Sequence, residues 1–283
     1  MEKACNMPEN KMPQFLYHYT SIESLALILK NHTIRFSSLD RMDDLQEKES
    51  KDVRNIGQFV YVSSWTSEST ESIPMWNMYA SLNAGIRIKL KSNPFQLHNN
   101  TAQELQKVSK TSVIDNTNGQ PVPSYIPFTE MWEKGFYCVQ AMNEIVPHRV
   151  EYTQDENKLY PSILNTNGEQ FSISLGEMGR YKNLHWEFQK EWRYILQILP
   201  LNLNQAPEML EPSFQLVANR ILHGVEKQAF PYYDMKIDDT AFSSMEITVS
   251  PRLSPGNWVI LESLIDKYNP SAQINKSTLQ DLL

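Results

Sequence analysis

Glycine is scarce in this chain, and its scarcity narrows the set of possible folds more than any other feature. Only 9 of the 283 residues are glycine, about 3% where roughly 7% is usual. Loops that cradle phosphate need glycine, because the backbone must approach the anion closely and adopt positive φ. Neither G-x-G-x-x-G nor G-x-x-x-x-G-K-S/T occurs in the sequence. We therefore expect neither a Rossmann dinucleotide site nor a P-loop nucleotidase.

The remaining composition predicts a folded chain of acidic character. Hydrophobic residues make up 41% of the chain and charged residues 21%, which supplies ample material for a core. The net charge is −7, whereas generic nucleic-acid binders normally carry a basic stripe. Cys5 and Cys138 are the two cysteines, too few for a disulfide framework or a four-ligand zinc site. A reducing compartment fits this count, and no metal cofactor is expected.

The sequence carries no signal of export or membrane insertion. Its first residues lack the apolar run of a signal peptide. The longest aliphatic run, Leu25–Leu29, is far shorter than the roughly 20 residues that cross a bilayer. We therefore expect a cytoplasmic protein with no membrane partner.

Hydrophobic periodicity predicts a single mixed α+β domain over residues 14–283, after a flexible tail over 1–13 and with an insertion near 96–132. Alternating or aromatic-rich runs predict strands over 15–19, 33–37, 58–65, 85–90 (half-exposed) and 191–200, and strand-like stretches over 214–218 and 221–226. Helical spacing predicts helices over 22–31, 75–82, 175–189 and 258–268. The charged stretch 39–52 is typical of a loop that enters a solvated helix.

Two of these strands carry polar side chains that could bind a sugar. His18 lies near the end of the first strand, where its imidazole could hydrogen-bond a ribose hydroxyl. The alternative is a half-buried histidine satisfied by the backbone. Strand alternation places Ser64 and Thr66 on one face, where their hydroxyls could orient a sugar or a carboxylate. The alternative is an ordinary strand end, where serine is common.

A third candidate is the segment WEFQKEWR, residues 186–193. Gln189 and Glu191 lie two positions apart and would share a face in extended chain. A carboxylate there could bind a sugar hydroxyl and stabilise positive charge on an anomeric carbon. The alternative is a surface ion pair of Glu191 with Arg193 or Lys182, although the flanking tryptophans make a plain solvated face unfavourable.

The acidic cluster Asp43, Asp44 and Glu47 could bind a divalent cation. Its spacing fits no EF-hand loop, and the glycine that such a turn requires is absent. A solvated helix start, with acids at the positive end of the helix dipole, is the favoured alternative.

The order of these segments resembles a bacterial family catalogued as domain of unknown function 2971. The matching motifs are LYHYTS (16–21), LILKN (27–31), IRFSS (34–38), VSSWTSE (62–68), MWNMYA (75–80), GIRIKL (85–90), WEFQKEWR (186–193) and the region around 247–278. Two departures are visible. The family's Asn-Asp-Pro is Met42-Asp43-Asp44 here, and its Glu-x-Glu is Gln189-Lys190-Glu191.

That arrangement is in turn similar to the ADP-ribosyltransferase superfamily, which binds NAD on a split antiparallel β core without a glycine-rich loop. The resemblance implies catalytic roles for His18 on a ribose, Ser64 beside the carboxylate, and Glu191 on the ribose 2′-hydroxyl and the oxocarbenium ion. It also implies that Gln189 orients the acceptor and that Tyr79 or Trp76 stacks on nicotinamide. The implied NAD contacts are Tyr19, Thr20, Thr66, Trp76, Tyr79, Gln189 and Arg193.

Three functions are open at this point. The first is an NAD-consuming ADP-ribosyltransferase or NAD glycohydrolase, a bacterial toxin or phage-defence effector, with NAD as substrate and a protein, nucleic acid or water as acceptor. It requires His18, Ser64 and Glu191 to converge on one cleft. The second is a non-catalytic module that binds a nucleotide or a protein. The third is a metal-dependent nuclease built on the acidic cluster.

Overall fold

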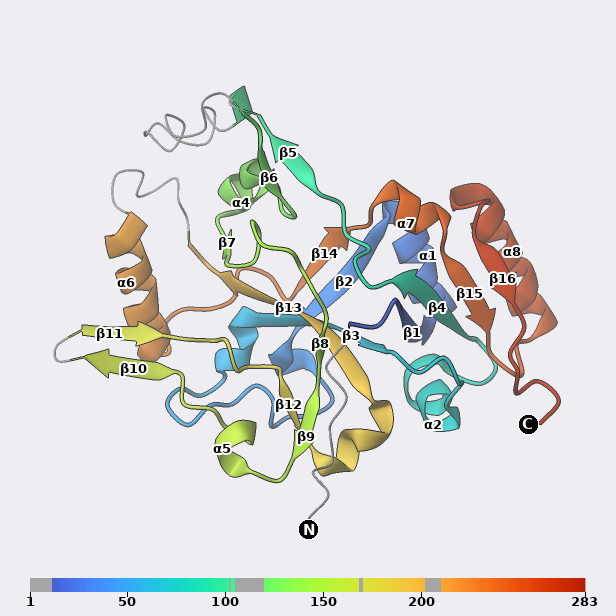
Figure 1. The fold of residues 1–283 in the computed structure, drawn as a ribbon, viewed down its shortest axis with the longest axis horizontal. Helices are drawn as coiled ribbons and strands as arrows, with labels where there is room; N and C mark the ends of the chain where they lie inside the picture. The colour runs from blue at the N-terminus through green and yellow to red at the C-terminus, as the bar shows by residue number, and fades with distance from the viewer. Residues whose placement is uncertain (1–11, 102, 105–119, 168–169, 202–209, 283) are drawn as a thin grey trace, which may run out of the picture.

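The computed structural model describes residues 12–101, 103–104, 120–167, 170–201 and 210–282. A ten-stranded sheet runs through the centre of these residues (Figure 1). Its main path is β14 (Tyr232–Lys236), β2 (Thr33–Ser38), β3 (Val60–Thr66), β1 (Phe15–Ser21), β4 (Gly85–Lys91), β15 (Glu246–Val249) and β16 (Gln273–Asn275). Off this path, β13 (Glu191–Leu199) pairs with β3, β7 (Tyr137–Cys138) and β8 (His148–Arg149). The pairs are antiparallel except β15 with β16, so the predicted α+β class is confirmed.

The first two strands are joined by α1 (Ile22–Asn31), which has the predicted bounds. The Ser21 hydroxyl accepts a hydrogen bond from the Ser24 amide at 3.2 Å and caps the helix. The helix ends at His32, whose φ of 54° turns the chain into β2. Its buried face carries Ile22, Leu25, Ile28 and Leu29, the side chains whose spacing predicted the helix. This β1–α1–β2 unit places two parallel strands against one edge of β3.

The sheet is split along that edge of β3. Val62 pairs with Ser37 of β2, while Thr66 pairs with Tyr17 of β1. Residues 63–65 between these points pair with neither strand in the described chain. The opposite edge of β3 is continuous with β13, from Val60 opposite Gln197 to Thr66 opposite Glu191. Strands β1 and β2 therefore pair with different ends of β3 and leave room between them.

The other elements surround this sheet. Three small sheets pair β5 (His98–Asn100) with β6 (Val122–Ser124), β9 (Glu151–Thr153) with β12 (Tyr181–Asn183), and β10 (Leu164–Asn167) with β11 (Gln170–Ile173). Further α-helices in the described residues include α2 (Ile73–Met75), α4 (Phe128–Lys134), α5 (Glu156–Leu159), α6 (Leu210–Leu222), α7 (Asp239–Ser243) and α8 (Pro255–Tyr268). The 3₁₀ helices are η1 (Leu39–Arg41), η2 (Ile56–Phe59) and η5 (Leu184–Gln189), and η3 (Trp76–Ala80) is a π-helix. In the described part of the chain, no helix has both the length and the apolar character needed to span a bilayer.

Two of the three clusters of buried apolar side chains in the described residues hold most of these elements together. The larger one joins Leu16 of β1, Leu25 of α1 and Leu261 of α8, each fully buried. The smaller one joins Leu39 of η1 to Ile221 of α6. Burying one such side chain contributes about 1.5–3 kcal/mol, so both clusters stabilise the packing around the split sheet.

Several sequence predictions differ from this fold. The helix predicted over 175–189 is wrong, because β12 and η5 occupy most of it. The strand-like stretches over 214–218 and 221–226 are wrong for the described helix α6, in which Phe214, Val217 and Ile221 recur at helical spacing and pack into the smaller cluster. Strand β4 is mostly buried rather than half-exposed, because α1, α7 and η3 pack against it. The tail over 1–11 and much of the insertion near 96–132 lie outside the described residues.

The charged stretch 39–52 does not enter a solvated helix. It begins with η1 and continues through turns and bends. Asp44 and Glu47 are buried in it, and the Asp44 carboxylate accepts a hydrogen bond from the Gln46 amide at 3.0 Å. This stretch runs beside the edge of β3 because Leu39 and Val53 belong to the smaller apolar cluster.

Candidate active site

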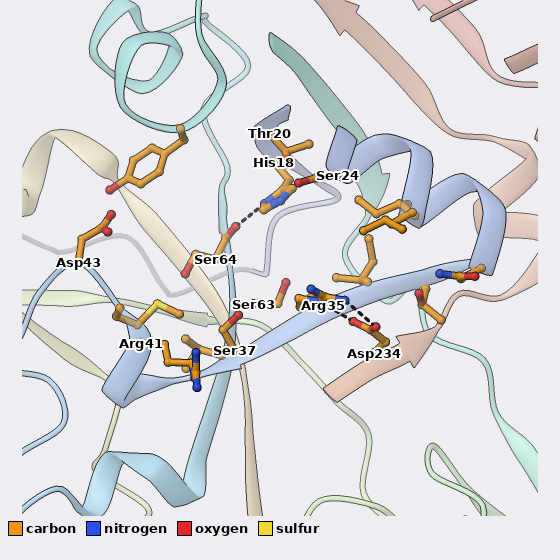
Figure 2. A pocket seen from close by; sticks show the side chains of 18 residues that line it. His18, Thr20, Ser24, Arg35, Ser37, Arg41, Asp43, Ser63, Ser64 and Asp234 are labelled. Carbon is orange, nitrogen blue, oxygen red and sulfur yellow. Dashed lines mark hydrogen bonds and ion pairs between the residues drawn. The ribbon is translucent and has the colours of Figure 1, made fainter. Parts of the chain in front are cut away.

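A cavity of about 350 Å³ opens where β1 and β2 part from β3 (Figure 2). His18 and Thr20 of β1, Ser63 and Ser64 of β3, and side chains of α1 and β2 line it. A second cavity of about 90 Å³ shares five of its lining residues, which are His18, Met42, Asp43, Ser64 and Tyr79. The two cavities therefore form one cleft, with a volume in the range of small-molecule sites. The smaller compartment reaches Gln189, Glu191 and Arg193.

His18 lies on the wall that both compartments share. Its Nδ1 is 2.8 Å from the Ser64 carbonyl oxygen, and its ring lies 5.0 Å from that of Trp65. Because a carbonyl can only accept, Nδ1 donates and Nε2 of the neutral ring is left as an acceptor. Burial lowers the pKa of His18, and the bond to the Ser64 carbonyl opposes that shift only in part. The histidine is thus satisfied by backbone, as the alternative interpretation held, and it also lines the cleft.

The lowered pKa of His18 predicts a dependence of stability on pH. The folded protein binds this proton less readily than the unfolded chain, whose histidine titrates near the ordinary value of 6.5. As the pH falls below 6.5, the histidine of the unfolded chain therefore binds a proton that the folded protein does not bind. The free energy of unfolding then decreases by up to about 1.4 kcal/mol per pH unit. Urea denaturation at about pH 7.5 and pH 5 should show a steeper loss for the wild type than for His18→Gln. The exposed His223, replaced by glutamine, is the control, and parallel losses in wild type and His18→Gln would contradict the prediction.

Only one of the two predicted hydroxyls on β3 faces the cleft. Ser64 lines both compartments and lies opposite Arg193 in the register with β13. A hydrogen bond from its hydroxyl helps to lower the pKa of Glu191. Thr66 lines neither compartment, and its hydroxyl donates to the Lys190 carbonyl at 3.2 Å. Ser64 therefore links the histidine and the glutamate of the predicted site.

Glu191 belongs to a buried cluster of alternating charges. Its Oε1 accepts from Arg193 Nε at 2.6 Å and its Oε2 from Lys182 Nζ at 2.9 Å. Arg193 also donates both terminal nitrogens to Glu47, with Nη2 at 3.0 Å from Oε2. The side chains of Glu47, Lys182, Glu191 and Arg193 are between 1% and 7% exposed. The alternative of an ion pair named the correct partners, but the pair is buried and not on the surface.

The charge balance of this cluster keeps Glu191 ionised. Burial alone would raise the pKa of Glu191, but the positive charges of Arg193 and Lys182 outweigh it and bring the pKa down to about 2. Arg193 is further fixed by the Gly179 carbonyl, which accepts from Nη1 at 3.1 Å. Gly179 has a φ of +78°, a conformation that favours glycine. The cluster therefore presents a fixed, ionised carboxylate to the smaller compartment.

Gln189 and Tyr79 complete the wall next to Glu191. The left-handed Lys190, with φ of 44°, turns the chain between η5 and β13, so that Gln189 and Glu191 both line the smaller compartment. Lys182 Nζ donates to Gln189 Oε1 at 2.8 Å, and Gln189 Nε2 donates to the Tyr79 hydroxyl. Burial raises the pKa of Tyr79, so its hydroxyl stays protonated. Tyr79 and Asp43, the latter labelled in Figure 2, both line the two compartments.

The remaining predicted contacts are divided between the cleft and the core. Thr20 lines the larger compartment and Tyr19 the smaller one. Trp76 lines neither, because it is fully buried, donates to Glu71 at 2.9 Å and meets the Tyr19 ring edge-on at 4.9 Å. The structure thus brings together all the predicted residues except Thr66 and Trp76.

Two arginines of the larger compartment were missed from the sequence. Arg35 of β2 donates to both Asp234 oxygens at 2.8 and 2.9 Å and stacks over Tyr232 at 3.7 Å. Its partners lie on β14 and follow it by about 200 positions, so no local pattern could reveal the pair. Arg41 is exposed, lines the cleft and forms no ion pair within the described residues. It is the cation that the cleft offers to an anionic ligand.

The acidic cluster does not form a cation site in this fold. Asp43 faces the cleft, Asp44 caps a turn and Glu47 pairs with Arg193. Across the part of the chain that the structure describes, no group of three or more His, Cys, Asp or Glu side chains could hold a metal ion. The geometry gives the metal-dependent hypothesis no ligand set.

Comparison with known proteins agrees with the family resemblance over part of the chain. No curated protein and no solved structure matches. A family model matches residues 75–194, which span η3, β4 and the start of β13 and include Tyr79, Gln189 and Glu191. Over residues 75–194 the chain is therefore similar to the family described as "Protein of unknown function (DUF2971)".

Proposed function

We propose that this protein is an NAD-consuming enzyme of the ADP-ribosyltransferase kind that cleaves the bond between nicotinamide and ribose. The observation that carries the proposal is the convergence of His18, Ser64 and Glu191 on one cleft at the split of an antiparallel sheet. The fold supports it as well, because the cleft is lined by strands and holds no glycine-rich phosphate loop. The resemblance to the ADP-ribosyltransferase fold is part of this proposal.

A negative charge beside the ribose would stabilise the transition state for cleavage of the nicotinamide–ribose bond. The C1′–N bond breaks, and its electron pair goes to the nicotinamide nitrogen, which loses its positive charge. Positive charge then develops on the ribose, where a fixed carboxylate stabilises it. With water as acceptor, the products are ADP-ribose, nicotinamide and a proton. With a protein or nucleic acid as acceptor, its nucleophilic atom forms the new bond to C1′.

The side chains around Glu191 suit that role. The Nε2 of His18 can accept a hydrogen bond from a ribose hydroxyl, since Nδ1 is taken by the Ser64 carbonyl. Lys182 donates to Gln189 as well as to Glu191. A ribose 2′-hydroxyl can therefore take the place of the ammonium at Glu191 Oε2 while Lys182 keeps its bond to Gln189. Arg193 holds the other carboxylate oxygen in place throughout.

The larger compartment suits the rest of the dinucleotide. Arg41 carries a charge that no acidic side chain neutralises within the described residues, so a pyrophosphate can pair with it. Arg35 is already neutralised by Asp234 and supplies a planar surface instead. We assign the adenosine diphosphate part of NAD to this compartment and the nicotinamide riboside part to the smaller one.

The decisive test is release of nicotinamide from NAD by the purified protein, measured by chromatography. The wild type should release it, and Ser64→Ala should do so about 10- to 100-fold more slowly, because a hydrogen bond to a charged group contributes about 1.5–3 kcal/mol. Ser263→Ala, on the exposed face of α8, is the matched control and should equal the wild type. Calorimetry with NAD separates the alternative function: binding without nicotinamide release by the wild type would support a non-catalytic module and contradict the proposal.

A further inference from the structure

Glu71 is a buried carboxylate that lies outside the cleft and is satisfied entirely by neutral donors. Its exposed fraction is 8%. It accepts from Trp76 Nε1 at 2.9 Å, from the Ser277 hydroxyl at 2.6 Å, and from the Thr278 amide and hydroxyl at 2.7 and 2.9 Å. No cation pairs with it within the described residues. One carboxylate therefore ties the π-helix η3 to the segment Ser277–Leu279, about 200 positions further along the chain.

These contacts end at the wall of the cleft. Trp76 and Ala80 of η3 pack with Tyr19 in a third buried cluster, the small cluster, which is separate from the two described above, and Leu279 and Tyr79 pack against it. The Ser72 amide donates to the Tyr19 hydroxyl at 3.0 Å, and this bond holds the residue that precedes α2 and η3 against β1. Tyr79 then leaves the cluster to line both compartments. Movement of the Ser277–Leu279 segment would consequently shift η3 and change the position of Tyr79.

The segment is joined to η3 by polar contacts rather than by a large apolar surface. Leu279 is its one side chain in the small cluster, and Ser277 and Thr278 contact Glu71 through hydrogen bonds. Burial alone would raise the pKa of Glu71, but the hydrogen bonds from Ser277, Thr278 and Trp76 outweigh burial, lower this pKa and keep the carboxylate ionised. An ionised carboxylate is the acceptor that four donors require.

We propose that Glu71 and the segment Ser277–Leu279 are positioning elements that hold η3, so that Tyr79 is set at the cleft and the affinity for NAD follows from that setting. The part concerning NAD rests on the function proposed above. Glu71 and the Trp76 side chain that it contacts line neither compartment of the cleft, so Glu71 does not touch the reacting atoms in this scheme. We call the hydrogen bonds between Glu71 and the segment Ser277–Leu279 the anchor. Loss of this anchor should therefore raise the KM for NAD and leave kcat close to its wild-type value.

Two variants test the anchor. Glu71→Gln keeps the shape but turns an amide donor toward two of the four donors, because each carboxylate oxygen accepts from two of them. The double variant Ser277→Ala with Thr278→Ala removes the two hydroxyl donors from the other side. Both should raise the KM for NAD about tenfold, by analogy with other hydrogen bonds to charged groups, with kcat nearly unchanged. Hydrogen exchange of the amides of residues 73–80 should become about tenfold faster in both variants. Glu262→Gln, exposed on α8, is the control and should change neither quantity.

The two measurements separate the anchor from the proposed function. Faster exchange together with a higher KM supports the inference. Wild-type exchange over 73–80 in the double alanine variant, which is the milder change, would overturn the anchor whatever the activity. Faster exchange with an unchanged KM would overturn its link to the cleft. If the wild type neither binds nor cleaves NAD, the NAD part falls with the proposed function, and exchange alone decides whether Glu71 holds η3.

Discussion

Replacing Glu191 with glutamine is expected to slow nicotinamide release from NAD by about 10²–10³-fold, the usual effect of removing one preorganised electrostatic group. The carboxylate is ionised, with its pKa lowered to about 2 by Arg193 and Lys182, and it lines the compartment that we assign to nicotinamide riboside. A glutamine of the same shape keeps contact with the ribose but supplies no negative charge to the oxocarbenium ion. The measurement is kcat/KM from chromatographic progress curves.

Glu187→Gln is the matched control for this experiment. Glu187 is exposed on η5, four positions before Glu191, and lines a different cavity. It should retain wild-type turnover. Thermal unfolding of both variants must accompany the kinetics, because Glu191→Gln also removes a partner from two buried cations. Wild-type turnover by a folded Glu191→Gln protein would rule out the assigned role of this carboxylate.

Replacing Arg193 with methionine should destabilise the protein by about 3–5 kcal/mol, because it leaves buried carboxylates without their main cation. Glu47 and Glu191 both bind this guanidinium, and neither carboxylate is more than 5% exposed. Lys182 remains, but its ammonium is 3.8 Å from Glu47. Urea denaturation at neutral pH, read by tryptophan fluorescence, gives the free energy of unfolding.

Arg220→Met supplies the comparison on the surface. Arg220 pairs with Glu226 at 2.6 Å, but its side chain is 51% exposed. Loss of such a pair should cost less than about 1 kcal/mol. Equal losses for Arg193→Met and Arg220→Met would show that the buried cluster contributes nothing beyond an ordinary surface pair.

Local signals predicted the parts of the fold that local contacts determine. The bounds of α1 were predicted from its apolar spacing, and the structure shows the buried face together with a cap at Ser21. Strands β1, β2 and β13 were predicted close to their observed bounds. The solvated helix predicted after the stretch 39–52 was wrong because Glu47 is buried against Arg193, which lies 146 positions away in the sequence. The strand prediction for the residues of α6 was wrong because β-branched and aromatic residues favour a strand. In the structure, packing against the smaller apolar cluster stabilises a helix instead.

The candidate site likewise contains some residues that local sequence signals could predict and others that they could not. His18, Ser64 and Glu191 could be predicted because strand ends and strand alternation place side chains on one face. Gln189 lines the cleft for another reason than the two-residue spacing, because the left-handed Lys190 turns the chain between η5 and β13. Trp76 and Tyr79 are three positions apart, and α-helical spacing would put them together. The π-helix widens the turn, as the bond from the Ser81 amide to the Trp76 carbonyl at 2.7 Å shows. Trp76 consequently points into the core while Tyr79 reaches the cleft.

The pairing of β14 with β2 has a consequence for how this protein folds. Tyr232 lies opposite Ser37, about 200 positions earlier, so one wall of the cleft is completed by residues near the other end of the described chain. During synthesis β2 emerges long before its outer neighbour exists. Contacts of such high sequence separation slow folding, because a long loop must close before they stabilise anything. Until β14 arrives, β2 is an open edge that can pair with another chain, so aggregation of nascent chains should compete with folding at this strand.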